Sequence, residues 1–437
     1  MSRIVWLSEA FALALTFVLL ITPLVIRSAA LLKLYDAPDG GRKAHDHPVP
    51  RVGGVPVFLG GALVCVILFI RTQPLFVTPG LVGEAQIRFL AGAFIGASLL
   101  FLTGLVDDVR GLSAGSKAVA QIVAAGVAIY FGAGIDHIAL GYGQGVSVGI
   151  VEIPLTLLWI VGVTNAFNFI DGLNGLATGI AVVACAAMFV AGLVLGNFMV
   201  LLPAAVLCGA LLGFLHFNFP KGNIFLGDSG SLSVGFLLAV LSLQASTNKS
   251  GAVLVILPVL GVFVPLMDGA LAIIRRWLRH VPLSGADARH IHHRLLALGI
   301  SPSRTVVVLW LLAAGMAGLG LLMALTAPFV ATSIAIFGLV GVAVLLIYGT
   351  NLLSYHELMV AGEVLMSAPS RARRVISDQI LALDLTGLIH NATSMDDVAL
   401  ILSEAGMQFG FFGMELSDVS LGSDRFADRV ITANWAW

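Results

Sequence analysis

Long apolar runs alternate with short polar segments along the chain as far as about residue 350. A helix needs about 20 mostly apolar residues to cross the hydrocarbon core of a bilayer. Eleven runs reach or approach this length. They lie at 7–26, 52–70, 89–106, 118–132, 150–170, 173–194, 198–217, 231–245, 251–273, 305–325 and 329–349. The pattern predicts an all-α polytopic membrane protein with about eleven transmembrane helices.

The composition excludes an ordinary water-soluble protein. Charged residues make up 11 % of the 437 residues and hydrophobic residues 59 %, whereas soluble domains are about 25 % charged. The formal net charge of −1 gives no reason to expect nucleic acid as a partner, and the lipid bilayer is the expected surrounding. Cys65, Cys185 and Cys208 lie in apolar runs without metal-ligand spacing, which is typical of small buried hydrophobic residues.

The distribution of Lys and Arg predicts the orientation. With the amino terminus outside, 19 of the 23 basic residues fall in inner connections or in the segment after 350. Cytoplasmic loops carry such an excess, so we expect the amino terminus outside and the carboxyl terminus in the cytoplasm. The chain then divides into a transmembrane domain at 1–350 and a cytoplasmic extension at 351–437.

The polar clusters all fall on the inner side of this topology. They are 42–54, 107–117, 165–175, 220–231 and 275–294. Several inner loops that meet at one membrane face predict a single site there, built from segments far apart in the chain.

Four carboxylates stand at or just past the inner helix ends: Asp107, Asp108, Asp171 and Asp228. Hard oxygen ligands favour Mg²⁺ or Mn²⁺ over zinc, and a divalent cation relieves the repulsion between the adjacent Asp107 and Asp108. The alternative for such a pair is a solvated helix end without an ion.

The segment 165–175 places Asn165, Asn168 and Asp171 at three-residue spacing, so they share one helix face. Such groups can bind a polar ligand or complete a metal shell. Capping of the helix end is the alternative.

The segment 220–231 places Asp228 between two glycines, and Ser229 and Ser231 open the next helix. Helix amino termini with Gly and Ser attract phosphate. Phe225 offers either a stacking surface for a base or an anchor at the membrane interface.

The last inner loop carries three histidines within four residues, His290, His292 and His293, followed by Arg294. Imidazole and guanidinium groups suit phosphate binding, whereas a basic loop that only sets topology would not need the histidines. Asp268 lies inside an apolar run, where a functional role and a pairing with Arg275 are both open.

Six segments together resemble the polyprenyl-phosphate N-acetylhexosamine-1-phosphate transferase superfamily, glycosyltransferase family 4. They are DAPDGGRKAHDHPVPRVGG, GLVDDVRGLSAGSK, NAFNFIDGLNGLATG, GNIFLGDSGSLSVG, PLMDGALAIIRR and HIHHR, and they occur in the family's order over about 30–350. The chain is most similar to the bacterial undecaprenyl-phosphate N-acetylglucosamine-1-phosphate transferases.

The resemblance implies a reaction. The phosphate of undecaprenyl phosphate attacks the β-phosphorus of a UDP-N-acetylhexosamine with Mg²⁺ or Mn²⁺ present, and UMP leaves. It also implies a multi-pass protein of the bacterial inner membrane, with a periplasmic amino terminus and a site on the cytoplasmic face. N-acetylglucosamine is the default sugar; N-acetylfucosamine, N-acetylquinovosamine and N-acetylgalactosamine stay open, as does a homodimer.

The resemblance also assigns roles. Asp228 is the expected direct metal ligand, with Asp107 and Asp171 as further metal ligands. Asp107, Asp108 and Asp171 are the expected catalytic residues. The expected substrate-binding residues are Lys117, Asn168, Asn218, Phe225, His290, His292, His293 and Arg294.

One position departs from the family, which commonly has a second Asp where this chain has Asn174. The uncharged Asn174 is therefore not expected to be a metal ligand. We expect direct displacement rather than a covalent aspartyl route, because a phosphate nucleophile is already ionised near neutral pH. A secondary transporter is the rival class, but its fold would show internal repeats and polar residues near the bilayer midplane.

The segment after 350 changes character and carries no assigned chemistry. Ser394 to Asp397 fits a capping box that opens a helix. The stretches 406–418 and 429–437 are typical of strands.

Overall fold

The structure is a computed structural model. It describes residues 3–32, 34–36, 49–76, 84–139, 146–197, 199–247, 253–254, 256–278, 290–326, 388–389, 397–398, 401, 413–420 and 429–436. The chain forms two compact units, one of Met1–Ala272 with Ala286–Val344 and one of Ile273–Gly285 with Leu345–Trp437.

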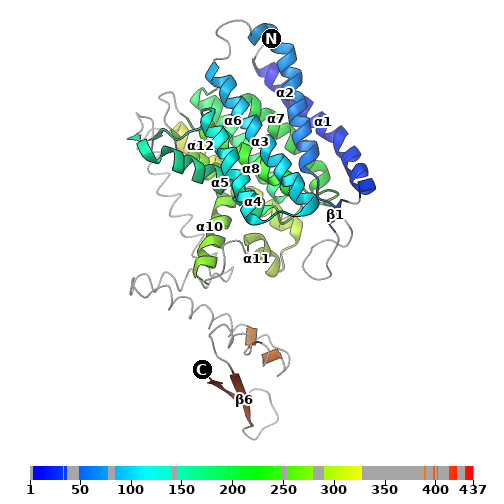
Figure 1. Ribbon diagram of the computed structural model, residues 1–437, viewed down its shortest axis with the longest axis vertical. Helices are drawn as coiled ribbons and strands as arrows, with labels where there is room; N and C mark the ends of the chain where they lie inside the picture. The colour runs from blue at the N-terminus through cyan, green and yellow to red at the C-terminus, as the bar shows by residue number, and fades with distance from the viewer. Residues whose placement is uncertain are drawn as a thin grey trace. The chain divides into compact units, whose positions relative to one another are not determined.

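The first unit is built from helices (Figure 1). In chain order they are α1 (Arg3–Leu32), α2 (Gly54–Phe76), α3 (Glu84–Arg110), α4 (Ala114–Tyr130), α5 (Glu152–Ile170), α6 (Leu176–Leu195), α7 (Leu201–Asn218), α8 (Gly227–Ala245), α9 (Ile256–Gly261), α10 (Phe263–Leu278), α11 (Ile291–Ala297) and α12 (Pro302–Leu325). A 3₁₀ turn at Gly149–Val151 precedes α5, and α10 ends within the second unit.

Seven helices in the described part of the chain are long and apolar enough to cross a membrane. They confirm the expected all-α polytopic membrane protein. The helices α2 and α4 contribute shorter apolar segments, Gly54–Ile67 and Ala114–Tyr130. The run at 251–273 is divided among a short strand, α9 and α10, and the run at 329–349 lies outside the described residues. The count of eleven stays a prediction.

The helix α8 lies at the centre of the bundle, with α2, α3, α5 and α6 packed against it (Figure 1). Nearly all of its residues are buried. Its Gly, Ser and Ala residues let neighbouring backbones approach closely, which is how helices associate in a membrane without a hydrophobic driving force between them. The segment around Asp228, at the amino end of α8, is thereby surrounded by other helices.

Short strands complete the first unit. The strand β1 (Tyr35–Asp36) pairs antiparallel with β2 (Val49–Pro50). The strand β3 (His137–Ala139) pairs antiparallel with β4 (Val146–Ser147) and parallel with β5 (Val253–Leu254). These strand pairs lie in the connections between helices and are not part of the helical bundle.

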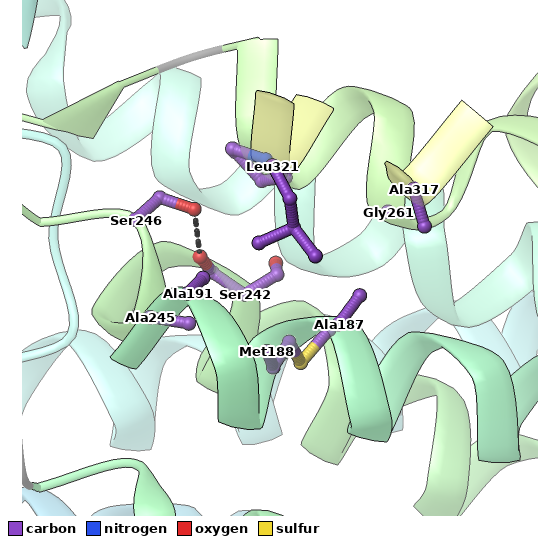
Figure 2. A pocket seen from close by; sticks show the side chains of 10 residues that line it. Ala187, Met188, Ala191, Ser242, Ala245, Ser246, Gly261, Ala317 and Leu321 are labelled. Atoms are coloured by element: carbon purple, nitrogen blue, oxygen red, sulfur yellow. Dashed lines mark hydrogen bonds between the residues drawn. The ribbon is translucent and has the colours of Figure 1, made fainter. Parts of the chain in front are cut away.

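A small cavity of about 20 Å³ lies among α6, α8, α9 and α12 (Figure 2). It is lined by Met188, Ser242, Ser246, Leu321 and small residues, and the Ser246 hydroxyl donates to the Ser242 carbonyl at 2.6 Å. This volume holds about one water molecule, so the cavity is too small for a substrate.

In the second unit, β6 (Gly413–Ser420) pairs antiparallel with β7 (Arg429–Ala436), with Gly413 opposite Ala436. The hairpin confirms the strands expected at the end of the chain, over the part of them that the structure describes. Ser394 and most of 351–412 lie outside the described residues, so the division at 350 stays a prediction.

Candidate active site

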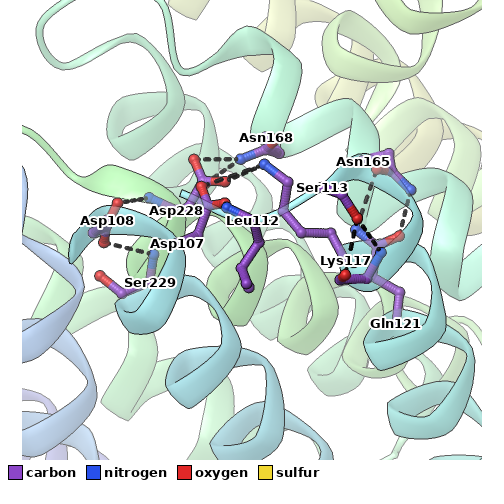
Figure 3. Close-up of polar contacts among 12 residues, drawn as sticks. Asp107, Asp108, Leu112, Ser113, Lys117, Gln121, Asn165, Asn168, Asp228 and Ser229 are labelled. Atoms are coloured by element: carbon purple, nitrogen blue, oxygen red, sulfur yellow. Dashed lines mark hydrogen bonds and ion pairs between the residues drawn. The ribbon is translucent and has the colours of Figure 1, made fainter. Parts of the chain in front are cut away.

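The adjacent acids Asp107 and Asp108, in the last turn of α3, point to different partners (Figure 3). The Asp108 carboxylate accepts the backbone N–H groups of Asp228 at 2.7 Å and Ser229 at 3.0 Å. It therefore caps the amino terminus of α8, where free N–H groups and the helix dipole favour a negative charge. The Asp107 carboxylate accepts the backbone N–H of Leu112 at 2.6 Å.

Lys117, in the second turn of α4, joins Asp107 to Asp228. Its ammonium group lies 3.3 Å from Oδ2 of Asp107 and 2.9 Å from Oδ2 of Asp228. On the other side, the Asn168 amide donates to Oδ1 of Asp228 at 3.1 Å and to the Ser231 hydroxyl at 2.9 Å. Residues of α3, α4, α5 and α8 thus form one connected polar cluster (Figure 3). It lies where α3 and α5 end and α4 and α8 begin, at one end of the bundle.

Close backbone packing makes this cluster possible. Gly227 has a φ of +72°, and a side chain there would meet the Arg51 carbonyl and the Asp108 carboxylate. The preceding loop is joined to the start of α2, because Phe225 donates its N–H to the Pro50 carbonyl at 2.8 Å and accepts one from Gly53 at 2.9 Å. Glycine at 227 therefore lets α8 begin directly against the end of α3.

Asp171 follows the last residue of α5. Burial, together with the nearby carboxylates of Asp228 and Asp108, raises the pKa of its carboxyl to about 8. The Arg51 cation and the Gly227 N–H oppose this shift. The Asp171 carboxyl group therefore lies near those of Asp228 and Asp108.

The donor set fits a hard divalent cation. The described residues contain no group of three or more His, Cys, Asp or Glu side chains arranged to hold a metal. However, Mg²⁺ is usually held by one or two carboxylates together with waters and substrate phosphates. Asp107 and Asp228 meet this requirement, since both already face a single cation, the Lys117 ammonium group.

The histidine segment reaches the end of α5 through α11. His290 Nδ1 lies 2.8 Å from Oδ2 of Asp268, and the Ile291 N–H donates to Oδ1 of Asp268 at 2.9 Å. Both side chains are buried. Asp268 is therefore paired with a histidine, and its carboxylate fixes the side chain of His290 and the start of α11.

His292 lies directly against the backbone of Gly172, the residue after Asp171. It is 1 % exposed, and both of its ring nitrogens lack a hydrogen-bond partner among the described residues. Burial, together with the neighbouring His293 and His290, lowers the pKa of His292 to about 3, against a smaller opposing effect of Asp268. The ring is neutral at physiological pH, with one nitrogen free to accept and the other to donate.

Comparison with known proteins identifies the family. Residues 90–246 match the model of glycosyl transferase family 4. A probable undecaprenyl-phosphate N-acetylglucosaminyl 1-phosphate transferase of Bacillus subtilis is 35 % identical over 311 residues, which cover 71 % of this chain and 83 % of the relative. The chain belongs to glycosyl transferase family 4.

Two further relatives of this family 4 enzyme come from other bacteria. A decaprenyl-phosphate N-acetylglucosaminephosphotransferase of Mycobacterium tuberculosis is 36 % identical, over 62 % of this chain and 71 % of the relative. An undecaprenyl-phosphate alpha-N-acetylglucosaminyl 1-phosphate transferase of Salmonella typhi is 29 % identical, over 72 % of this chain and 83 % of the relative.

Two asparagines of this family 4 enzyme that the sequence suggested as ligand-binding residues have partners outside the polar cluster around Asp228. Asn165 pairs with the Gln121 side chain, at 2.7 and 3.2 Å. The buried Asn218 accepts the Gly175 N–H and donates to the Ile224 carbonyl, both at 2.9 Å, so its amide joins the loops after α5 and α7. A contact of Asn218 with a nucleotide stays a prediction.

The remaining expected residues lie around this cluster. Phe225 is part-exposed in the loop before α8, and His293 and Arg294 are part-exposed on α11. Their substrate contacts stay predictions. The structure gives partners to three residues to which the sequence assigned no definite role in the site: Ser231 beside Asn168, Arg51 near Asp171, and Asp268 behind His290. The position of Asp268 inside an apolar run was the signal available for the last of these.

Proposed function

We infer that this chain transfers N-acetylglucosamine-1-phosphate from UDP-N-acetylglucosamine to undecaprenyl phosphate. UMP is released, and undecaprenyl-diphosphate-N-acetylglucosamine remains in the membrane as the starting unit of a cell-surface polysaccharide. The names of the three relatives support the sugar and the polyprenyl phosphate. The observation that carries the inference is that the carboxylates of Asp107 and Asp228 face one cation, the Lys117 ammonium group, at the end of a membrane bundle.

Charge explains why these residues suit the reaction. The donor diphosphate and the acceptor phosphate are both anionic, so catalysis depends on neutralising charge and aligning two phosphates rather than on a strong base. Asp107 and Asp228 would hold Mg²⁺ or Mn²⁺, with Asp171 as a further ligand, and the bound ion would neutralise the diphosphate. Asn168 holds the Asp228 carboxylate from the opposite side.

The other residues divide between positioning and binding. Asp108 fixes the start of α8, and Asp268 fixes His290. The neutral His292, with His293 and Arg294, would contact the diphosphate of the donor. Phe225 would lie near the uracil. A direct attack by the lipid phosphate needs no covalent enzyme intermediate.

The proposed setting is the bacterial inner membrane, crossed about eleven times, with the amino terminus periplasmic and the carboxyl terminus cytoplasmic. The excess of Lys and Arg in the inner connections supports this orientation. The site then faces the cytoplasm, where a charged nucleotide sugar reaches it, while the lipid acceptor reaches it from the bilayer.

The test is UMP release by the purified full-length protein in lipid nanodiscs, with UDP-N-acetylglucosamine, undecaprenyl phosphate and Mg²⁺. Release should stop with EDTA and return with Mg²⁺ or Mn²⁺. The Asp228→Asn variant should lose at least about 100-fold in rate, because it removes a charge at the reacting phosphates. The exposed Asp136→Asn is the matched control and should keep full activity.

A panel of UDP-sugars identifies the donor, with UDP-N-acetylgalactosamine and the fucose and quinovose analogues beside UDP-N-acetylglucosamine. Turnover of another member and not of UDP-N-acetylglucosamine would correct the sugar. Release of UMP by no member, together with substrate flux across a sealed vesicle, would favour a transporter and overturn the inference.

A further inference from the structure

Lys117 occupies the position between the two carboxylates best placed to hold a metal. Its ammonium group contacts Oδ2 of both Asp107 and Asp228. The exposed fraction of the side chain is 25 % for Lys117, 15 % for Asp107 and 25 % for Asp228. The ion pairs are thus partly shielded from water. Charges in such a place interact more strongly than charges at an open surface.

A divalent cation and this ammonium group compete for these oxygens. Mg²⁺ binds carboxylate oxygen at about 2.0–2.1 Å, which is well inside the contacts that the ammonium group makes with the same atoms. Two cations at one pair of carboxylates also repel each other. A metal that took both oxygens would therefore force the Lys117 head group away.

Neither carboxylate depends on Lys117 for its position. Oδ1 of Asp107 accepts the Leu112 N–H, and Oδ1 of Asp228 accepts the Asn168 amide. The Lys117 backbone is held separately, because its N–H donates to the Ser113 carbonyl at the start of α4. The head group can leave while both acids stay in place, since a lysine side chain has a flexible four-carbon stem.

We propose that Lys117 is an internal counter-ion that metal binding displaces from Asp107 and Asp228, and that the released ammonium group then binds a substrate phosphate. This inference rests on the proposed function for the metal and the phosphates. It gives the site an order of assembly. The lysine neutralises the acids before the metal arrives, and metal entry frees a cation for the anionic substrates.

The first test measures Mn²⁺ affinity by electron paramagnetic resonance on the full-length protein without substrate. The Lys117→Met variant should bind Mn²⁺ about tenfold more tightly than the native protein, because the competing charge is gone. Lys117→Arg should stay near the native affinity, since it keeps the charge. The exposed Lys221→Met is the control and should change nothing. Equal or weaker binding by a folded Lys117→Met variant would overturn the proposal.

The second test uses the native protein and so does not depend on the folding of a variant. Lysine acetylation by a water-soluble reagent is followed by mass spectrometry with and without Mg²⁺. Labelling of Lys117 should rise several-fold with Mg²⁺, whereas labelling of Lys221 should not. Labelling of Lys117 that is unchanged or reduced by Mg²⁺ would contradict displacement.

These readouts separate the two claims. Native protein that releases UMP but shows neither effect at Lys117 would sink the counter-ion role and leave the transferase intact. Displacement of Lys117 by Mg²⁺ without UMP release from any UDP-sugar would support the counter-ion role and overturn the transferase.

Discussion

The carboxylate of Asp108 accepts the backbone N–H of Asp228 at 2.7 Å, although 120 residues separate them. This bond fixes the orientation of the first turn of α8 and with it the direction of the Asp228 side chain. Asp107, the immediate neighbour of Asp108, faces Lys117 instead. The two adjacent acids therefore do different work, one holding a helix and the other facing a cation.

The substitution Asp108→Asn should cost stability as well as activity. An amide presents only one acceptor to two backbone donors, and the loss of a hydrogen bond to a charged group costs about 1.5–3 kcal/mol. Asp107→Asn should abolish UMP release with little loss of stability, because its remaining oxygen still accepts the Leu112 N–H. Thermal unfolding in detergent, beside the UMP assay, measures both effects. Equal destabilisation by the two substitutions would contradict the division of roles.

The pair of Asp268 and His290 should behave as one unit. Asp268→Asn and His290→Gln each break the 2.8 Å contact, so each should lower kcat for UMP release by about tenfold or more. The double variant should be little worse than either single variant, because interacting residues are not additive. A double-mutant cycle on kcat measures this coupling. Independent, additive losses would show that Asp268 does not act through His290.

Gly172→Ala should displace His292. An alanine methyl group at 172 would overlap the His292 ring, whose position is enclosed by protein. Overpacking typically costs about 1–3 kcal/mol, and the KM for the UDP-sugar should rise because the ring contacts the donor in the proposed site. Gly126→Ala is the matched control, since nothing lies within 4 Å of a methyl group there and the residue is exposed on α4. The control should keep its melting temperature or gain slightly.

His292 should make the fold sensitive to mild acid. Its pKa is about 3 in the folded protein and about 6.5 when unfolded. The unfolded state therefore takes up a proton below pH 6.5 that the folded state refuses until about pH 3. The stability linked to His292 is complete above pH 6.5 and is lost as the pH falls toward 3, with about 2 kcal/mol gone by pH 5.

The measurement is the melting temperature at pH 7 and pH 5 for the native protein and for His292→Asn, which does not titrate. The fall between the two pH values should be smaller in the variant. All other titratable groups are present in both proteins, so the difference between the two falls reports on His292. The same fall in both proteins would mean that His292 takes up its proton normally when folded.

The helical bundle could be predicted because each helix carries its own signal. The apolar run at 89–106 is longer than a helix of a soluble protein needs. The observed helix α3, Glu84–Arg110, contains this run and extends a few residues beyond each end. The run at 251–273 was harder, since its apolar pattern continues through the break between α9 and α10 at Val262. Hydropathy indicates which residues are buried in lipid or protein, but it gives little information on where a helix is interrupted.

The candidate site was predicted as a set of residues but not as a set of contacts. Asp107, Asn168, Asp171 and Asp228 were expected at one membrane face, and the structure places them at one end of the bundle. The shared amide of Asn218 and the pairing of Asn165 with Gln121 were not foreseen. An asparagine in an apolar segment indicates that a partner exists, and it does not say which one.

The sequence by itself determined that this protein spans a membrane, where most of its long helices lie, and which polar groups lie at one end of the bundle. These properties follow from local composition, because the bilayer selects helices by length and apolarity. Only the tertiary structure decided that Asp108 caps α8 while Asp107 faces Lys117, and that His290 belongs to Asp268. Successive side chains on a helix point about 100° apart, so neighbours in sequence meet partners that only the packing of distant helices brings near.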